Sequence, residues 1–509
     1  MKQGLTSRDL IDAGYQPGPS FKTLLNLISQ YEERGITDPK YQLKLLKRDY
    51  APPPPKAVMR EKSLKCAEAI HATNKEEKEN LHAVRRQMEQ LLKVPVITAG
   101  AVMPDACPAS MQTAVIPVGG VIAVENAIIP SAHSADICCS MFATFYEKRS
   151  DVSSELDSLT TATRFGVGHR HLDDLVYDPV LDEPVWNNRF LYGMRDRAHA
   201  HLADQGDGNH FAYIGEVDVT PEMLAVLRLT RHTDLADRLS AKRYRVLVTH
   251  HGSRGLGAHV YKRGQAVALK NTSRNADRIP PAAVWIDADS PEGKDYWAAL
   301  QYVSRWTHAN HRVIHQRFLE RIGATLEAQI GNEHNFVWKR GDTFFHGKGA
   351  TPAWKDDDGR PLLGLIPLNM AEPILLVLGS DREDYLSFAP HGAGRNLSRT
   401  ALKKRFPDPD SRLAEIERST RGLDIRWYCG KPDLSETPVA YKNADTVRKQ
   451  IEEFGLAEVI AEINPLGCIM AGDSGRSWRD REKPLTPKQK RQIQHRKERR
   501  RVNQDLRDR

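Results

Sequence analysis

The pattern of apolar and polar positions changes twice along the chain. In residues 1–50 the apolar positions that recur at helical spacing are Phe21, Leu24, Leu25, Ile28 and Tyr31. Gly35 follows them as a stop signal, so the pattern predicts a small helical element. A second helical stripe lies in residues 59–93, at Leu81, Val84, Met88 and Leu91. The first part of the chain is therefore expected to be helical.

From about residue 95 to residue 473, short Val and Ile runs alternate with Gly-rich turns and amphipathic stretches. This texture predicts one large α+β body, a mixed β-sheet flanked by helices. Residues 443–463 have the pattern of one more surface helix. The four-proline run 52–55 is typical of a stiff linker. We therefore expect a helical N-terminal extension (1–94), a body (95–473) and a C-terminal tail (474–509).

Composition favours a soluble globular protein. The chain has 509 residues, of which 40% are hydrophobic and 28% charged. No apolar run approaches the ~20 residues of a membrane span, and the N-terminus lacks the apolar region of a signal peptide. Six cysteines, two of them adjacent at Cys138 and Cys139, are too sparse for a disulfide scaffold. We interpret them as reduced thiols in a cytoplasmic protein without a membrane partner.

The positive charge is concentrated at the C-terminal end. Residues 476–509 hold 14 Lys and Arg against 5 Asp and Glu, while the whole chain has a net charge of +8. The remaining chain is therefore nearly neutral. A basic block of this kind either binds a polyanion or is a solvated end, and composition alone leaves both interpretations open.

Five potential metal ligands lie in short turns that glycine or asparagine flanks. They are Asp136, Cys139, His210, His250 and His334, in the segments SADICCSM, DGNHF, VTHHGSRGLG and EHNF. A single histidine beside glycine is more often a packed side chain than a ligand. The set of one carboxylate, one thiolate and three imidazoles suits a transition metal such as Mn, Fe, Co or Zn. It lacks the paired CxxC spacing of a structural zinc site.

A second group of motifs has the chemistry of a phosphate site. In HGAGR, residues 391–395, glycines allow backbone N–H groups to approach an anion, and Arg395 and Arg399 can each bind phosphate oxygens with two hydrogen bonds. His391 could act there as a nucleophile or as a general acid or base. Segments 253–255 and 348–349 combine glycine with a cation in the same way. Ordinary surface turns are the alternative interpretation.

These motifs together resemble those of the RtcB-type RNA ligases, enzymes of tRNA splicing and RNA repair that use GTP and manganese. The resemblance runs from about Met103 to Gly472 and rests on GNHF, HxGSRGLG, HN, KGAT and HGAGRxxSR in the family's order. It implies an RtcB-like α+β fold with a deep metal-containing cleft.

The resemblance also implies roles for individual residues. Cys139 would bridge two Mn²⁺ ions, with Asp136 and His210 completing one site and His250 and His334 the other. His391 would attack the α-phosphate of GTP, and Asp105 would be a carboxylate near the metals. The implied nucleotide pocket consists of Asn209, Phe211, His391, Gly392, Ala393, Gly394, Arg395, Arg399 and Tyr441. The implied partner is RNA with a 3′-phosphate or 2′,3′-cyclic phosphate at one end and a 5′-hydroxyl at the other.

Several positions depart from the family pattern. Cys138 and Ser140 replace two glycines, and Cys107 replaces a histidine. Cys138 either adds a thiol near the metals or fills space, and we favour space-filling. Tyr213 and Ala471 stand where the family has a carboxylate and a lysine that recognise guanine, which predicts relaxed nucleotide selectivity with GTP as the main donor. Further departures are His251, Gly347 and the segment 366–371.

Three functions remain open from the sequence. The first is an RNA ligase for 3′-phosphate and 5′-hydroxyl ends. The second is an enzyme that caps 3′-phosphate ends without sealing them, or a metal-dependent phosphoesterase. The third is an RNA-binding protein without activity; the retention of all five candidate metal ligands and of His391 argues against it. The RNA target and the oligomeric state do not follow from the sequence.

Overall fold

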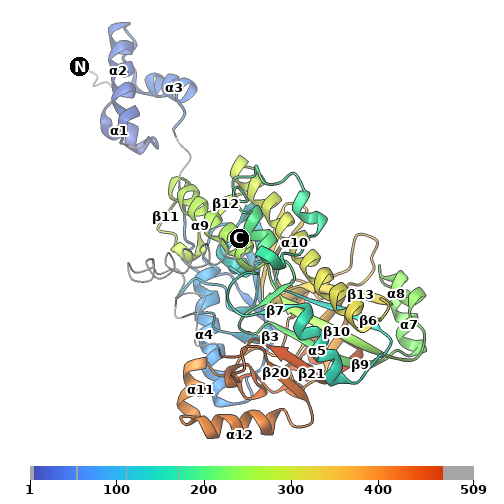
Figure 1. Ribbon diagram of the computed structural model, residues 1–509. Helices are drawn as coiled ribbons and strands as arrows, with labels where there is room; N and C mark the ends of the chain where they lie inside the picture. Colours follow the sequence, from blue (N-terminus) through green and yellow to red (C-terminus); the bar gives the residue numbers. More distant parts are fainter. Residues whose placement is uncertain (1–4, 16, 53–55, 111, 171, 474–509) are drawn as a thin grey trace, which may run out of the picture.

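The computed structural model describes residues 5–15, 17–52, 56–110, 112–170 and 172–473. It is an α+β structure built around two β-sheets with helices on their outer faces (Figure 1). The predicted proline linker falls largely on residues 53–55, and the basic tail on 474–509, so both predictions lie outside the described residues. Within the described chain, no helix has the length and apolar character needed to cross a membrane.

The larger sheet has eight strands and positions most of the candidate ligands. Its strands in spatial order are β13 (Ala328–Glu333), β6 (Ser140–Tyr146), β10 (Arg243–His251), β9 (Phe211–Asp218), β21 (Ala457–Met470), β18 (Ile374–Gly379) and β17 (Leu363–Pro367), with β20 (Asp424–Trp427) beside β21. All neighbours along the main path are antiparallel. The start of one strand therefore lies beside the end of the next.

A five-stranded sheet lies next to it. Its strands are β14 (Asn335–Arg340), β15 (Thr343–Lys348), β4 (Val118–Glu125), β3 (Ile97–Cys107) and β2 (Cys66–Glu68). The chain passes from the larger sheet to this one at His334, between β13 and β14. Four two-stranded sheets complete the set: β1 (Ala57–Val58) with β11 (Ala276–Asp277), β5 (Ala127–Ile128) with β12 (Ile286–Asp287), β7 (Arg164–Phe165) with β8 (Asp204–Gly206), and β16 (Ala350–Pro352) with β19 (Phe388–Pro390).

Helices pack against both sheets. The longest, α10 (Pro291–Ile322), begins after Ser290, whose hydroxyl accepts a hydrogen bond from the N–H of Gly293, and it ends at Gly323 in a left-handed conformation. It contacts β6 and β10 and carries buried side chains along most of its length. The other body helices are α4 (Lys75–Leu91), α5 (Val152–Ala162), α6 (Arg195–Ala200), α7 (Pro221–Leu227), α8 (Thr233–Arg238), α9 (Arg254–Asn275), α11 (Arg399–Arg405), α12 (Pro409–Ser419) and α13 (Ala444–Glu453).

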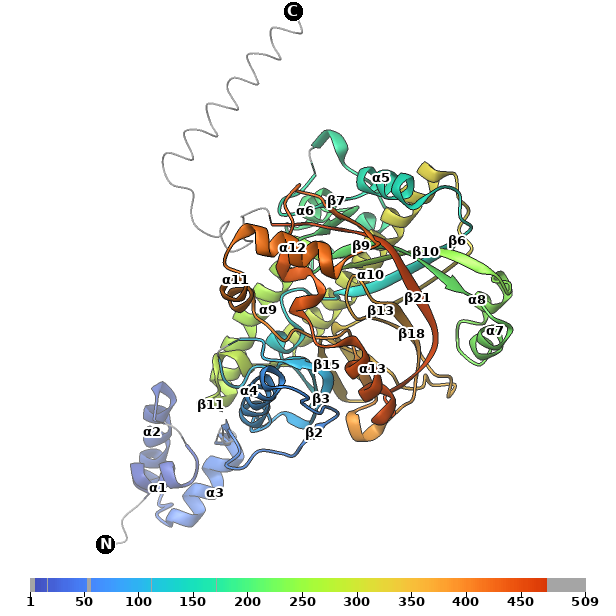
Figure 2. The same cartoon turned by 90° about the horizontal axis from the view of Figure 1, so that it is seen from below.

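The predicted N-terminal helices form their own small cluster. Helices α1 (Ser7–Asp12), α2 (Pro19–Glu33) and α3 (Pro39–Asp49) share a core that includes Leu10, Leu24, Ile28 and Leu46. Figures 1 and 2 show these helices as a group of their own, apart from the body. Helix α4, by contrast, contacts β3, and β2 pairs with β3. Residues 57–94 thus pack as part of the body, although the sequence pattern assigned them to the extension.

The helix expected at 443–463 is only half correct. Helix α13 covers its first half, but Gly455 turns the chain with φ +61°, and β21 then runs from Ala457 between β18 and β9. The second helical stripe also begins later than expected, at Lys75. In both segments strand pairing to distant parts of the chain decides the structure, and a local pattern does not report such pairing.

Candidate active site

The candidate metal ligands meet at one end of four adjacent strands. Asp136 and Cys139 precede β6, His210 precedes β9, His250 lies near the end of β10, and His334 follows β13. Because these strands run antiparallel, the beginnings of β6 and β9 lie beside the ends of β10 and β13. His250, for example, is paired with Phe211 on one side. Five residues that are up to about 200 positions apart in sequence are thus brought together.

The ligand atoms form two overlapping groups. Cys139, His250 and His334 make one group, and Asp136, Cys139 and His210 make the other. The Cys139 thiol lies 3.2 Å from Nε2 of His250 and 3.6 Å from Nε2 of His210. Nε2 of His250 lies 3.1 Å from Nε2 of His334, and Nε2 of His210 lies 3.0 Å from the Asp136 carboxylate. Cys139 is the one member shared by both groups.

Backbone carbonyls fix the orientation of two of these imidazoles. Nδ1 of His210 donates to the carbonyl of Gln205 (3.0 Å), and Nδ1 of His250 donates to the carbonyl of Asn209 (3.1 Å). In the neutral form of each ring, Nε2 then carries a lone pair that is directed at the other candidate ligands. Nε2 of His210 and the Asp136 carboxylate face each other at 3.0 Å, and a bound cation would take the place of the proton that such a contact otherwise shares. The donor set therefore fits a pair of bound transition-metal ions.

Electrostatics within the cluster support the same conclusion. Burial alone would raise the pKa of Asp136, but the interactions with His210 and Cys139 outweigh it and lower the pKa to about 2. Burial lowers the pKa of His250 to about 3, and the neighbouring histidines act in the same direction. The carboxylate is therefore ionised and this imidazole neutral at neutral pH, which are the forms that bind metal ions.

His391 follows β19 and lies next to this cluster. Its ring centroid is 4.8 Å from that of His334. Nδ1 of His391 donates to the carboxylate of Asp105 at 2.6 Å, and that carboxylate is fully buried. This hydrogen bond fixes the tautomer and leaves Nε2 of the neutral ring as a free nucleophile. Asp105 comes from β3, so the smaller sheet orients His391 through this hydrogen bond, while the larger sheet positions the candidate metal ligands.

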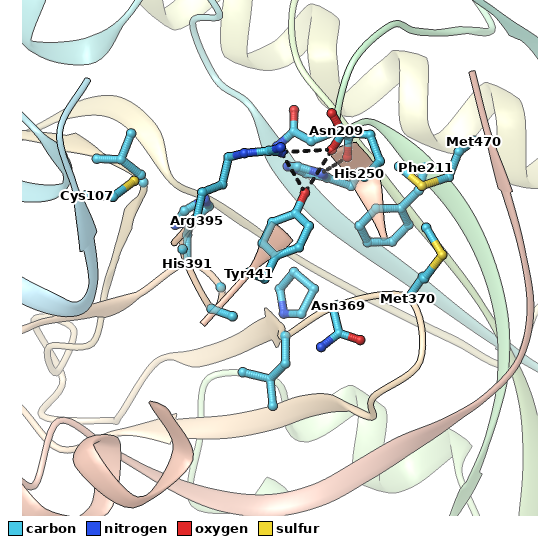
Figure 3. Close-up of a pocket in the computed structure, with 18 of the residues that line it drawn as sticks. Cys107, Asn209, Phe211, His250, Asn369, Met370, His391, Arg395, Tyr441 and Met470 are labelled. Carbon is cyan, nitrogen blue, oxygen red and sulfur yellow. Dashed lines mark hydrogen bonds and ion pairs between the residues drawn. The ribbon is translucent and has the colours of Figure 1, made fainter. Parts of the chain in front are cut away.

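A cavity of about 400 Å³ opens in front of His391 and His250 (Figure 3). Every nucleotide-pocket residue expected from the sequence lines it: Asn209, Phe211, His391, Gly392, Ala393, Gly394, Arg395, Arg399 and Tyr441. Gly394 has φ +73°, and a Cβ there would lie 2.0 Å from the carbonyl oxygen of Asp105. Only glycine fits this contact, so HGAGR needs glycine at that position to bring the backbone of β3 and the loop together.

The two arginines of the pocket share a buried carboxylate. Arg395 and Arg399 both contact Glu436, at 3.3 Å and 2.6 Å, and Tyr441 donates to the same carboxylate at 2.8 Å. In Figure 3 the Tyr441 hydroxyl points at the Arg395 guanidinium. The two other segments that combine glycine with a cation, 348–349 and 253–255, differ in their position relative to the cavity. Lys348 lines the cavity, and burial lowers its pKa to about 8, whereas Arg254 contacts Asp204 and does not line it.

Two polar residues of this cavity, Glu436 and Asn369, are not among the pocket residues expected from the sequence. Glu436 lies outside every motif named above, whereas Asn369 lies in the segment 366–371, which departs from the family pattern. Tyr213 also lines the cavity, but its hydroxyl donates to the backbone carbonyl of Ile463 at 2.8 Å and its ring is buried. Ala471 is buried as well. At these two positions, therefore, no charged group faces the cavity.

Fold and site together define a class: an α+β protein with a candidate two-ion His/Cys/Asp centre, a neighbouring histidine held by a carboxylate, and an anion-binding cavity. The family model described as tRNA-splicing ligase RtcB matches residues 187–471, more than half of the chain. The chain belongs to the RtcB family.

Named relatives support this assignment. The tRNA-splicing ligase RtcB of Aeropyrum pernix is 26% identical over 441 residues, which cover 72% of this chain and 86% of the relative. That of Thermococcus kodakarensis is 25% identical, over 75% of this chain and 90% of the relative. That of Pyrococcus abyssi is 28% identical over 310 residues, 54% of this chain. The match spans about a third of the length of the Pyrococcus abyssi protein.

Proposed function

We propose that the protein is an RNA ligase that joins a 3′-phosphate or 2′,3′-cyclic phosphate end to a 5′-hydroxyl end through a nucleotide carried on His391. The observation that supports it most is the position of His391. It lines the cavity, it is held by Asp105, and it lies against His334 of the metal-ligand cluster. The family membership and the relatives named tRNA-splicing ligase support the same activity.

The proposed reaction has three steps. Nε2 of His391 attacks the α-phosphorus of GTP, the bond to the β-phosphate oxygen breaks, and pyrophosphate leaves. A 3′-phosphate oxygen of RNA then attacks this phosphorus, the P–N bond breaks, and the imidazole is regenerated. Finally a 5′-hydroxyl loses its proton and attacks the activated 3′-phosphate, and GMP leaves. A cyclic phosphate is first opened by water.

The residues of the site suit these steps. During the first step positive charge develops on the imidazole, and the Asp105 carboxylate at Nδ1 stabilises it. Lys348, Arg395 and the HGAGR backbone present positive groups to the phosphates. Two Mn²⁺ ions would be held by Asp136, Cys139 and His210 and by Cys139, His250 and His334. Bound there, they supply Lewis-acid stabilisation of phosphate charge.

One observation favours a second candidate, an enzyme that caps 3′-phosphate ends without sealing them. Tyr213 and Ala471 replace charged groups of the family pattern, so the surroundings of the nucleotide have changed while His391 and the ligand cluster have not. Incubation with GTP, Mn²⁺ and an RNA pair bearing matched 3′-phosphate and 5′-hydroxyl ends separates the candidates. A joined strand supports ligation, and an RNA ending in a nucleotide cap with no joined product supports capping. Neither product, with RNA still bound, supports the binding protein instead.

A further inference from the structure

A third group of metal-ligating side chains lies behind the candidate two-ion centre. It consists of Cys138, His308 and Glu333, whose ligand atoms all lie within 4.8 Å of one another. We call it the Cys138 cluster. Cys138 precedes β6, Glu333 ends β13, and His308 lies on α10, which packs against this part of the sheet (Figure 1). The cluster shares no residue with the two-ion centre.

The backbone at Cys138 is strained. Its φ is +58°, in the left-handed region that favours glycine, and the family pattern has glycine there. A side chain at such a position is disfavoured because its Cβ crowds the backbone. The backbone holds it nevertheless: the N–H of Cys138 donates to the carbonyl of Asn335 at 2.7 Å, and the hydroxyl of Ser140 donates to the carbonyl of Cys138 at 3.1 Å. The buried thiol of Cys138 belongs to the group with His308 and Glu333, whereas the buried thiol of Cys139 belongs to the two groups of the two-ion centre.

The surroundings of the thiol are polar, which does not fit a side chain that only fills space. The hydroxyls of Ser304 and Thr307 on α10 lie against it, and so does the Glu333 carboxylate. Nε2 of His308 lies 2.8 Å from Glu333, and Ser304 donates to the same carboxylate at 3.3 Å. The side chain of His308 is 34% exposed, so solvent reaches the cluster from that side.

We propose that the Cys138 cluster binds a third metal ion, of the zinc class, separate from the two-ion centre. One thiolate, one imidazole and one carboxylate, with a fourth position open to water, is a donor set that zinc prefers over Mg²⁺ or Ca²⁺. Zinc bonds of about 2.0–2.3 Å at tetrahedral angles put ligand atoms roughly 3.3–3.7 Å apart. The ligand atoms of the Cys138 cluster lie between 2.8 Å, for Nε2 of His308 and the Glu333 carboxylate, and an upper limit of 4.8 Å, so their spacing brackets these separations.

Binding replaces protons by metal. The thiol of Cys138 and Nε2 of His308 each give up a proton to solvent, and the ion takes the place of these protons between the thiolate, the imidazole and the Glu333 carboxylate. The bound ion would join His308 on α10 to Cys138 and Glu333. Cys138 directly precedes Cys139, and Glu333 directly precedes His334. Its role would therefore be to fix the position of two ligands of the two-ion centre.

The test measures metal stoichiometry in the full-length protein. Wild type and variants are equilibrated with Zn²⁺, freed of loosely bound ions by gel filtration and analysed by elemental mass spectrometry. Cys138→Gly suits the left-handed backbone, so it is expected to fold normally and to retain one equivalent of zinc fewer than wild type. His308→Gln, whose change lies on α10, is expected to lose the same equivalent. Cys429→Ser removes an exposed thiol outside the cluster and keeps the full content.

Each result decides the question. Loss of one equivalent in both cluster variants, with a weaker thiolate-to-cobalt absorption band after Co²⁺ substitution, supports the site. Zinc contents equal to wild type in both variants overturn it and leave Cys138 as a packed thiol. If Cys138→Gly loses more than one equivalent by disturbing Cys139, His308→Gln decides: a full zinc content in that variant also overturns the proposal.

Discussion

Replacing Asp105 by asparagine tests how the nucleophile is prepared. In the structure the Asp105 carboxylate accepts a 2.6 Å hydrogen bond from Nδ1 of His391 and a second, 3.3 Å bond from its backbone N–H. Asparagine has nearly the same shape but no charge. It can present its NH₂ group to Nδ1 and so favour the tautomer in which Nε2 carries the proton. His391 would then lack a free lone pair toward the α-phosphate.

The size of the effect follows from the lost charge. A hydrogen bond to a charged partner contributes about 1.5–3 kcal/mol. Since 1.36 kcal/mol corresponds to a factor of ten in rate, Asp105→Asn should slow nucleotide transfer to His391 by about 10- to 150-fold. The bond strengthens as the imidazole gains positive charge, so the loss should appear in the rate of transfer more than in nucleotide affinity.

The assay is a time course of covalent labelling by radioactive GTP with Mn²⁺. The metal content of Asp105→Asn is expected to match that of wild type, because Asp105 is not among the ligands of the two-ion centre. Asp358→Asn, at an exposed turn, serves as the matched control. A labelling rate within twofold of wild type would refute the argument that this carboxylate orients and stabilises His391.

Three further predictions concern the metals, the tail and the base. Cys139→Ser should lower the content of both Mn²⁺ ions, measured by elemental analysis, because Cys139 belongs to both ligand groups and a serine hydroxyl is normally protonated. An unchanged metal content would show that Cys139 is not the bridge. Truncation before Arg476 removes a net charge of +9. It should weaken RNA binding and reduce the slope of log K against log salt concentration, with labelling of His391 unchanged. An unaltered slope would mean that the tail does not contact RNA. Competition among the four nucleoside triphosphates for labelling of His391 should show GTP preferred by less than about a thousandfold. The reason is that Tyr213 and Ala471 replace charged groups that would each contribute about 1.5–3 kcal/mol. A larger preference would assign guanine recognition to other residues such as Asn369.

The chemistry-bearing residues of the site could be predicted from sequence because they stand in short motifs. GNHF, HHGSR and HGAGR each combine a reactive side chain with a turn, and such a combination is recognisable without knowing the fold. The antiparallel register of β6, β9, β10 and β13 then explains why His210, His250 and Cys139 meet, which no local pattern reports.

The supporting residues could not be predicted in the same way. Glu436 acts through Arg395 and Arg399, and the positions of all three depend on the packing of separate loops. The neighbours of Cys138 in the fold, His308 and Glu333, are not predictable from a local pattern because they lie far away in sequence. The strand part of residues 443–463 was missed for a related reason: Gly455 and the alternation that follows it are weak signals, and pairing of β21 with β9 and β18 decides the structure.

The central claim is that His391 carries the nucleotide, and one measurement tests it most directly. Wild type and His391→Ala are incubated with radioactive GTP and Mn²⁺, the protein is denatured, and the labelled peptide is identified. The account predicts an acid-labile, alkali-stable adduct on His391 in wild type and none in His391→Ala, whose metal content is unchanged. An undiminished adduct in His391→Ala, or a label on another residue of the wild type, would contradict it.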